Sequence, residues 1–284
     1  MRRRWFALLP TGDASRAAEY LRSLLEGRES FPPRAAVVLG SGLSGACPAL
    51  DKELEVPFEE VPGWPESSVP GHRGCLRFGS RDGRGVLVQL GRLHYYEGHD
   101  MATVTLPVQV MHLLGVERVL LTNAAGGLNP TYLQGSLMLV RDHINLMGEN
   151  PLRGVKDPSG RPVFLDLSRL YREDVGDRLV QEASAMGVEL YEGVLVAMAG
   201  PTYETPAELR FLRVVGGDAV SMSLVPEAIV AHYLGMAVTG ISVITNVWDL
   251  RRPLPLSHGE VLEAAESAAA PLAKLIEAWL DAGI

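Results

Sequence analysis

The sequence predicts an α/β fold, in which a central β-sheet is flanked by helices. Short apolar runs such as 35–39 and 86–90, each followed by glycine, are typical of buried strands. Segments with apolar residues at helical spacing, such as 104–114 and 174–186, separate these runs along the chain. No linker divides the chain, and α/β folds of this length are commonly one domain, so we expect a single domain over residues 1–284.

Local patterns predict the elements of the first half. A helix within residues 1–30 has Asp13 as its expected N-cap, because apolar residues at helical spacing follow it. Strands near 75–78 and 86–90 should pair antiparallel, since Asp82-Gly83 between them is a hairpin signal. The helix over 104–114 is expected in spite of its proline, and a glycine ends it.

A glycine-rich segment at 40–45 follows the first strand and matches the dinucleotide-binding pattern GxGxxG. That kind of site needs a long helix directly after the glycines. Pro48 and three further prolines up to position 65 predict an irregular stretch instead, so we do not expect a nicotinamide site. A glycine-rich turn can still present backbone N–H groups and the Ser41 hydroxyl to an anion.

Four later strands are expected to end in polar or small residues. The expected strands are 119–121, followed by 122–127; 137–140, followed by 141–145; 193–198, followed by 200–205; and 238–245, followed by Asn246. The small residues at 122–127 allow either the close approach of a ligand or merely a tight turn. Residues 150–169 are rich in proline and glycine with little periodicity, and they predict a loop.

Two capping boxes predict where later helices begin. The first, at 205–208, has proline at the first helical position and leaves Glu204 just outside the helix. The second, at 257–260, begins a final helix over 258–281, with His258 in its first turn. A further helix opens at Pro226-Glu227.

Composition excludes several classes of function. The formal net charge of -8 argues against binding to nucleic acid or to a membrane surface, so an anionic ligand would need local donors. Cys47 and Cys75 form neither a disulfide framework nor a metal-binding spacing, which favours a reducing compartment.

The apolar N-terminal run stops at Pro10, too early for a signal peptide. The uncharged stretch 228–248 is interrupted by glycines and polar residues, which indicates a helix and a strand rather than a membrane span.

The segment 91–98, with the sequence GRLHYYEG, follows the strand at 86–90. Open α/β sheets bind ligands outside the carboxyl ends of their strands. Arg92 can grip phosphate oxygens in bidentate fashion, and His94 lies two residues away. Taken alone, the cluster could equally be a surface arginine and a packed histidine.

Other motifs accompany this cluster in a specific order. They are GSGL at 40–43, GRLHYYEG at 91–98, TNAAGGLNP at 122–130, RDHINL at 141–146, AGPTYET at 199–205, MSLVPE at 222–227 and ITN at 244–246. Together these seven motifs resemble the trimeric purine nucleoside phosphorylases, and the resemblance extends from about residue 37 to the final helix.

The resemblance implies a single domain with a mixed, partly barrel-like sheet, a homotrimer, and no metal or organic cofactor. The implied reaction is reversible phosphorolysis of purine ribonucleosides or deoxyribonucleosides, in which inorganic phosphate is the co-substrate. Phosphate attacks C1′ with inversion and releases the free base and the sugar 1-phosphate. The family implies a cytoplasmic enzyme of purine salvage, a pentosyltransferase.

The same resemblance assigns roles to residues of this chain. Phosphate would be bound by Ser41, His72, Arg92, His94, Ala124 through its backbone N–H, and Ser223. Ribose would be held by Tyr96, Met222 and His258, and the purine by Tyr203, Glu204 and Asn246. The residues expected to act in catalysis are Asn246, Glu204, His94 and His258.

The chemistry of the reaction calls for these residue types. Breaking a glycosidic bond builds positive charge on the sugar and negative charge on the leaving base. The amide of Asn246 can donate to N7 of the purine, and the Glu204 carboxylate can accept from N1–H or an exocyclic amine. Asparagine at position 246 resembles the branch that acts on 6-oxopurine nucleosides, inosine and guanosine, whereas relatives that act on adenine nucleosides have aspartate. Asp249 lies nearby, which leaves the base preference open.

Simpler interpretations exist for several of these residues. Glu204 could merely favour the adjacent helix N-terminus, and His258 could be an exposed first-turn residue. Met222 could be a core methionine. Either His72 or Arg73 could face phosphate. Family members commonly close the sugar site with an aromatic residue from a neighbouring subunit; the loop 150–164 has glycine near the equivalent place, so that contact stays unassigned.

Three other functions remain as alternatives. A methylthioadenosine or adenosine phosphorylase shares the fold, but Asn246 and His258 argue against it. A non-catalytic nucleotide-binding module would leave Arg92, Glu204 and Asn246 unexplained. A hydrolytic nucleosidase would use an activated water and gain nothing from a phosphate pocket.

Overall fold

The computed structural model describes residues 9–28, 31–65, 74–248 and 258–283. Its helices are α1 (Gly12–Leu25), α2 (Met101–Val104), α3 (Leu106–Leu114), α4 (Glu173–Ala185), α5 (Pro206–Val214), α6 (Val225–Tyr233), α7 (His258–Ser267) and α8 (Ala269–Asp281). Its strands are β1 (Ala35–Leu39), β2 (Asp51–Pro57), β3 (Cys75–Arg81), β4 (Arg84–Leu90), β5 (Arg118–Gly127), β6 (Leu137–Asn145), β7 (Leu190–Ala197), β8 (Ala219–Ser221) and β9 (Ala237–Val247). Short 3₁₀ helices are η1 (Ser44–Ala46), η2 (Phe58–Glu60) and η3 (Tyr95–Glu97).

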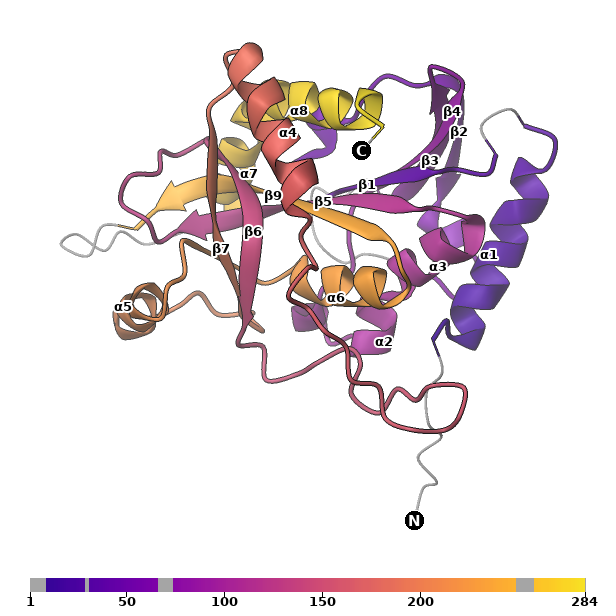
Figure 1. The fold of residues 1–284 in the computed structure, drawn as a ribbon, viewed down its shortest axis with the longest axis horizontal. Coiled ribbons are helices and arrows are strands. Elements are labelled where there is room, and N and C mark those ends of the chain that lie inside the picture. Colours follow the sequence, from indigo (N-terminus) through magenta and orange to yellow (C-terminus); the bar gives the residue numbers. More distant parts are fainter. Residues whose placement is uncertain (1–8, 29–30, 66–73, 249–257, 284) are drawn as a thin grey trace.

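The strands form one mixed sheet, part of which closes on itself (Figure 1). The order of the described strands is β2-β3-β4-β1-β5-β8-β7-β6-β9, and β9 pairs with β5 as well as with β6. This second pairing closes β5, β8, β7, β6 and β9 into a five-stranded ring, from which β1, β4, β3 and β2 continue as an open sheet. The predicted α/β class with a mixed, partly barrel-like sheet is confirmed.

Four central strands, β4, β1, β5 and β9, run parallel to their neighbours in that order. Their carboxyl ends therefore lie at one edge of the sheet. The register pairs Leu39 at the end of β1 with Leu90 at the end of β4, so the glycine-rich segment and the segment 91–98 leave the sheet side by side. Crevices at such an edge are where α/β folds bind ligands.

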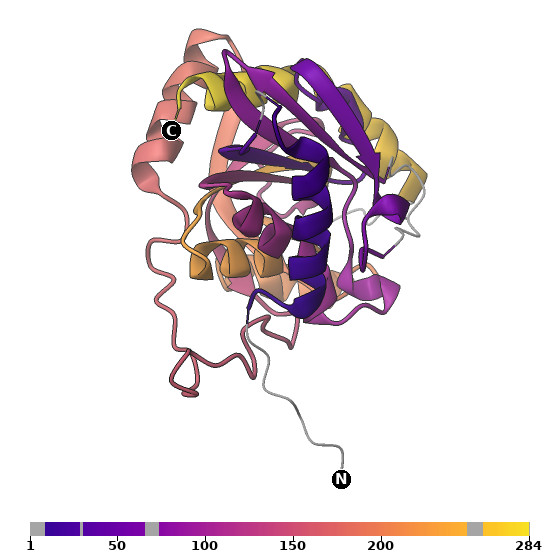
Figure 2. The same cartoon turned by 90° about the vertical axis from the view of Figure 1, so that its right-hand side faces the viewer.

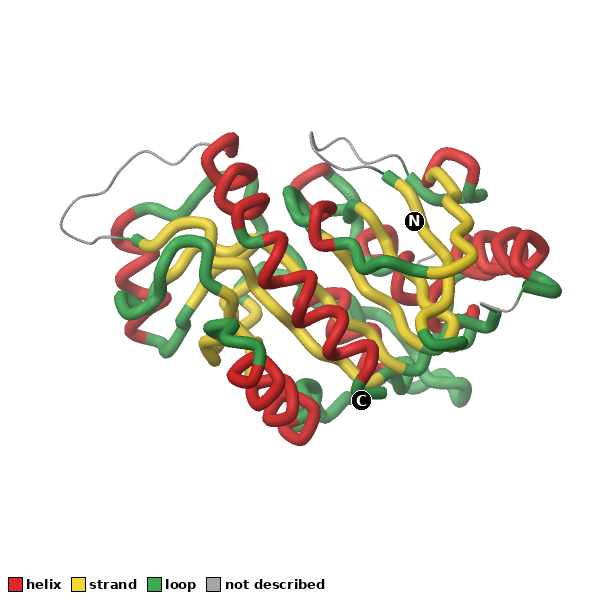
Figure 3. The backbone as a smooth tube through the Cα atoms, turned by 90° about the horizontal axis from the view of Figure 1, so that it is seen from above, coloured by secondary structure: helices red, strands yellow, loops and turns green. Residues whose placement is uncertain are grey.

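Helices cover both faces of this sheet, as alternate residues of β1 make clear. Ala36 and Val38 belong to the core shared with α1, α3 and α6. Ala35, Val37 and Leu39 belong to the core shared with α4 and α8. All five residues are buried, as expected for a strand covered on two sides. Figure 2 shows the α1 side, and Figure 3 shows α8 lying over the strands and ending at the C-terminus.

Several predicted elements are confirmed. β3 and β4 form the antiparallel hairpin around Asp82-Gly83. In the capping box of α5, the backbone N–H of Thr205 donates to Glu208 at 2.7 Å, and the backbone N–H of Glu208 donates to Thr205 Oγ1 at 3.3 Å. The glycine-rich segment ends in the short η1 and is not followed by the long helix of a dinucleotide site. In the described part of the chain, no helix combines the length and apolar character that crossing a bilayer requires.

Other boundaries were predicted wrongly. The N-cap of α1 is Thr11, whose hydroxyl accepts from the backbone N–H of Ala14 at 3.2 Å, whereas Asp13 pairs with Arg16. The final helix is interrupted near Ala268, which separates α7 from α8. β2 lies in the stretch that was expected to be irregular. The sequence did not predict this strand because its residues are mostly charged and exposed and form no apolar run. β5 and β6 extend through the residues that were expected to follow them.

Candidate active site

A cavity of about 480 Å³ opens at the carboxyl ends of β1, β4, β5 and β9. Ten of the twelve residues singled out in the sequence line it: Ser41, Arg92, His94, Tyr96, Ala124, Tyr203, Glu204, Met222, Ser223 and Asn246. The other two are histidines. His72 and the side chain of His258 lie outside the described residues. The structure thus brings together side chains from both halves of the chain.

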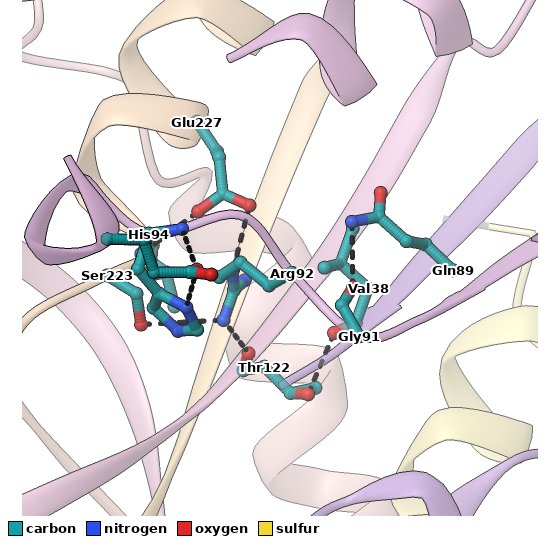
Figure 4. A network of polar contacts seen from close by, with 10 residues as sticks. Val38, Gln89, Gly91, Arg92, His94, Thr122, Ser223 and Glu227 are labelled. Carbon is teal, nitrogen blue, oxygen red and sulfur yellow. Dashed lines mark hydrogen bonds and ion pairs between the residues drawn. The ribbon is translucent and has the colours of Figure 1, made fainter. Parts of the chain in front are cut away.

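Arg92 is buried in the wall of the cavity, with 1% of its side chain exposed (Figure 4). Its Nε donates to Glu227 Oε1 at 2.8 Å, and its Nη1 donates to the carbonyl oxygen of Thr122 at 2.7 Å. Ser223 Oγ lies 3.5 Å from the same Nη1. A buried guanidinium needs a carboxylate partner such as Glu227, because moving an unpaired charge out of water costs free energy. The guanidinium is therefore held in one orientation.

His94 is held by a carboxylate on its own segment. Glu97 Oε1 lies 3.0 Å from His94 Nδ1 and also accepts from the His94 backbone N–H at 2.8 Å. Burial lowers the pKa of His94; the bond to Glu97 opposes this effect, and the charge of Arg92 adds to it. A neutral ring with its proton on Nδ1 fits this arrangement and leaves Nε2 as an acceptor.

Tyr96 stacks on the His94 ring, with centroids 4.6 Å apart and planes 20° apart. Burial raises the pKa of Tyr96 to about 12, and nearby Glu97 contributes to the rise. Tyr96 is therefore a neutral phenol at physiological pH, able both to donate and to accept a hydrogen bond.

Tyr203 and Glu204 lie on the loop between β7 and α5, which also contributes to the cavity wall. Burial raises the pKa of the Glu204 carboxyl, a hydrogen bond from its own backbone N–H opposes the rise, and Glu208 adds to it. Gly200 lies near the start of this loop with φ +66°, and a Cβ atom there would collide with Met222 Sδ. Glycine at position 200 therefore lets the loop pass directly against Met222.

Asn246 lies inside β9, next to an irregularity in the sheet. The β5–β9 register pairs Ala125 with Ile244 but Gly126 with Asn246, so Thr245 is an extra residue in β9. Such bulges re-aim the side chains beside them. The Thr245 hydroxyl donates to Asn246 Oδ1 at 3.2 Å, which favours presentation of the amide Nδ2 as a donor to the cavity.

Ala124 lies within β5 rather than beyond it. Its carbonyl oxygen accepts from Ser221 Oγ at 3.0 Å and from Asn123 Nδ2 at 3.1 Å. The Asn123 side chain is in turn held by Ser242, whose hydroxyl donates to Asn123 Oδ1 at 2.8 Å. These buried contacts fix the backbone where small residues form the cavity wall.

Sequence reasoning missed some residues of the site and included one motif that lies elsewhere. Gln134, Leu209, Trp248, Glu260 and Val261 also line the cavity. No local motif points to a role for them in the site, and the capping box at 257–260 marks Glu260 only as part of a helix start.

The motif at 141–146 does not reach the cavity. The His143 ring meets Tyr171 edge-on, with centroids 5.7 Å apart, and Arg141 pairs with Asp177 at 2.6 Å and with Glu192 at 2.5 Å. These contacts tie β6 to α4 and β7. Among the described residues, no group of three or more His, Cys, Asp or Glu side chains is placed to hold a metal ion.

Comparisons with known proteins agree with this geometry. The family model of the phosphorylase superfamily matches residues 34–281. Purine nucleoside phosphorylase 1 of Geobacillus stearothermophilus is 44% identical over 264 residues, which cover 92% of this chain and 94% of that protein. The structure of Schistosoma mansoni purine nucleoside phosphorylase with adenosine has a TM-score of 0.87 at 34% identity and covers 95% of this chain and 96% of its own. The Schistosoma enzyme with guanosine gives a TM-score of 0.85, with the same identity and coverage.

Proposed function

The chain belongs to the purine nucleoside phosphorylases of the phosphorylase superfamily, and from this premise we propose which residues carry its reaction. It catalyses the phosphorolysis of purine nucleosides such as guanosine and inosine. An oxygen of inorganic phosphate bonds to C1′ of the sugar while the glycosidic bond breaks. The bonding electrons leave with the purine, which takes up a proton. The products are the free base and the sugar 1-phosphate.

One observation carries the proposal. Arg92, which suits an anion, and His94, whose Nε2 can accept from a protonated phosphate oxygen, line the same cavity as Glu204 and Asn246, which suit a purine. We assign phosphate binding to Ser41, His72, Arg92, His94, Ala124 and Ser223. We assign the sugar to Tyr96, Met222 and His258. A phosphate anion beneath C1′ then stabilises the positive charge that develops on the sugar.

The purine is assigned to Tyr203, Glu204 and Asn246. Asn246 Nδ2 donates to N7, where negative charge develops as the bond to the sugar breaks. Glu204, as a carboxylate, accepts from N1–H of a 6-oxopurine. This pairing favours inosine and guanosine over adenosine, with methylthioadenosine phosphorolysis as the alternative specificity.

We propose further that residues 1–284 act as one domain, assembled as a homotrimer in the cytoplasm. The packing of α1 and α8 on opposite faces of one sheet supports a single domain. Exposed large apolar side chains, such as Phe164 at 94% and Val214 at 85%, supply surface that subunit contacts can cover. The mass of the assembly in solution tests the trimer.

The release of free base from inosine, guanosine and adenosine, each with and without phosphate, tests the reaction and the base preference together. We expect turnover of inosine and guanosine that disappears when phosphate is omitted. Preference for adenosine would retain the phosphorylase but overturn the roles assigned to Glu204 and Asn246. Turnover without phosphate would contradict phosphorolysis itself.

The pH dependence of nucleoside use tests Glu204. Protonation removes the negative charge that strengthens the hydrogen bond from N1–H, and burial raises the pKa of this carboxyl above its ordinary 4.5. At saturating phosphate, kcat/KM for inosine should therefore fall with decreasing pH at a pH above 4.5. Glu204→Gln cannot titrate, so its kcat/KM should be lower throughout and lack this acid limb. An unchanged acid limb in Glu204→Gln would assign it to another group.

A further inference from the structure

Glu227 is a buried carboxylate that contacts the site from behind. It lies in the first turn of α6, its side chain is 1% exposed, and it does not line the cavity. Its two oxygens have different partners. Oε1 accepts from Arg92 Nε at 2.8 Å, and Oε2 accepts from the backbone N–H of Leu224 at 3.1 Å. A single carboxylate therefore joins the phosphate-side arginine to the chain segment just before α6.

That segment is a strained turn. Leu224 has φ +75° and ψ -51°, and the backbone N–H of Val225 donates to the carbonyl oxygen of Ser223 at 3.0 Å. This combination is a γ-turn with positive φ at its centre, a rare conformation for a residue with a bulky side chain. Such strain persists only where surrounding contacts hold it. The turn begins at Ser223, directly after Met222. Both of these residues line the cavity.

The other oxygen of the Glu227 carboxylate holds Arg92. Glu227 holds Nε, and the Thr122 carbonyl holds Nη1 at 2.7 Å. Gly40 packs beside the guanidinium, because a Cβ atom on that glycine would lie 3.0 Å from Nη1. Since the guanidinium is planar, two fixed nitrogens and a close wall determine which way the group faces.

We propose that Glu227 is a positioning residue for phosphate binding, which holds both the Arg92 guanidinium and the strained turn that carries Ser223. The inference rests on the proposed role of Arg92 and Ser223 in binding phosphate. Holding both groups requires two acceptor oxygens on the side chain at position 227. A carboxylate accepts at both, whereas the amide of glutamine has a single acceptor oxygen and turns donors toward the other partner.

A purely electrostatic view predicts the opposite result. A negative charge beside an anion site repels the anion, so removing the charge alone would strengthen phosphate binding. Positioning predicts instead that phosphate binding weakens when the charge is removed, because Arg92 and Ser223 lose their orientation. The sign of the change in phosphate affinity therefore separates the two views.

The experiment compares the full-length enzyme with its Glu227→Gln and Glu227→Asp variants, with inorganic phosphate varied at saturating inosine. We expect Glu227→Gln to raise KM for phosphate about 10- to 100-fold, as for the loss of a hydrogen bond to a charged group. KM for inosine should change far less. Glu227→Asp keeps the charge but cannot span both partners, and it should also raise KM for phosphate. It serves as the second variant if Glu227→Gln does not fold.

Glu208→Gln is the matched control. Glu208 also accepts from the backbone N–H at the start of its helix, α5, but has no contact with Arg92. Its KM for phosphate should remain that of the unmodified enzyme. Unchanged or tighter phosphate binding in both Glu227 variants would overturn the proposal. Absence of phosphate saturation in the unmodified enzyme would instead overturn the proposed function on which it rests.

Discussion

Asn246→Ala is expected to lower kcat for inosine phosphorolysis several hundredfold, with a much smaller rise in KM for inosine. The amide donates to N7 most strongly when the purine carries negative charge, which happens only as the glycosidic bond breaks. A donor aimed at such developing charge contributes roughly 3 kcal/mol to lowering the barrier. An interaction made mainly in the transition state affects kcat rather than KM.

Steady-state rates with inosine, at saturating phosphate, measure this effect. Asn145→Ala provides a matched control, because Asn145 is at the end of β6, bonds to the Glu149 carbonyl at 3.0 Å and does not line the cavity. Its kcat should stay close to that of the unmodified enzyme. Equal kcat in Asn246→Ala would remove Asn246 from the catalytic role. A large rise in KM with unchanged kcat would mean that the contact is equally strong in the bound nucleoside and in the transition state.

Arg92→Met is expected both to unfold more easily and to lose its response to phosphate. Arg92 and Glu227 form an ion pair in which each side chain is 1% exposed. Removing one partner from such a pair leaves a buried charge and costs about 3–5 kcal/mol of unfolding free energy. Loss of the guanidinium also removes a donor assigned to phosphate, so turnover should no longer rise with phosphate concentration over the range that saturates the unmodified enzyme.

The double variant Arg92→Met with Glu227→Gln separates these two effects. It removes both charges, so it should regain part of the lost unfolding free energy, measured by urea denaturation, without regaining activity. Arg172→Met is the control for a lost ion pair: the side chains of Arg172 and Asp174 are 50% and 63% exposed, and an exposed pair contributes about 0–1 kcal/mol. Recovery of activity in the double variant would show that Arg92 acts through stability alone.

The sequence predicted the parts of the fold that depend on local patterns. Apolar runs gave β1 and β4, and the capping box at 205–208 gave α5, because these signals involve residues close together in the chain. β2 was missed because an edge strand is exposed and carries charged residues, which avoid further strand pairing but hide the strand from an apolar pattern. The small residues of 122–127 look like a turn until β8 and β9 supply partners for them.

The same distinction applies to the site. Glu97 lies three residues from His94, so the bond between them could have been inferred from a local motif. The pairing of Arg92 with Glu227 spans 135 residues, and no local pattern connects the two. The contributions of Gln134 and Glu260 likewise depend on how distant loops and helices pack around the cavity. Distant contacts of this kind require the three-dimensional structure.

The closure of the ring by β5 and β9 has a consequence for the order of events during folding. Among the paired strands, these two are farthest apart along the chain, and Asn246 lies on one while Ala124 lies on the other. Pairings between distant segments form slowly, since the entropy cost of closing a long loop precedes the stabilisation that the new contacts provide. A nascent chain can therefore bury much of its open sheet while still lacking a catalytic centre. Enzymatic activity should be among the last native properties to appear.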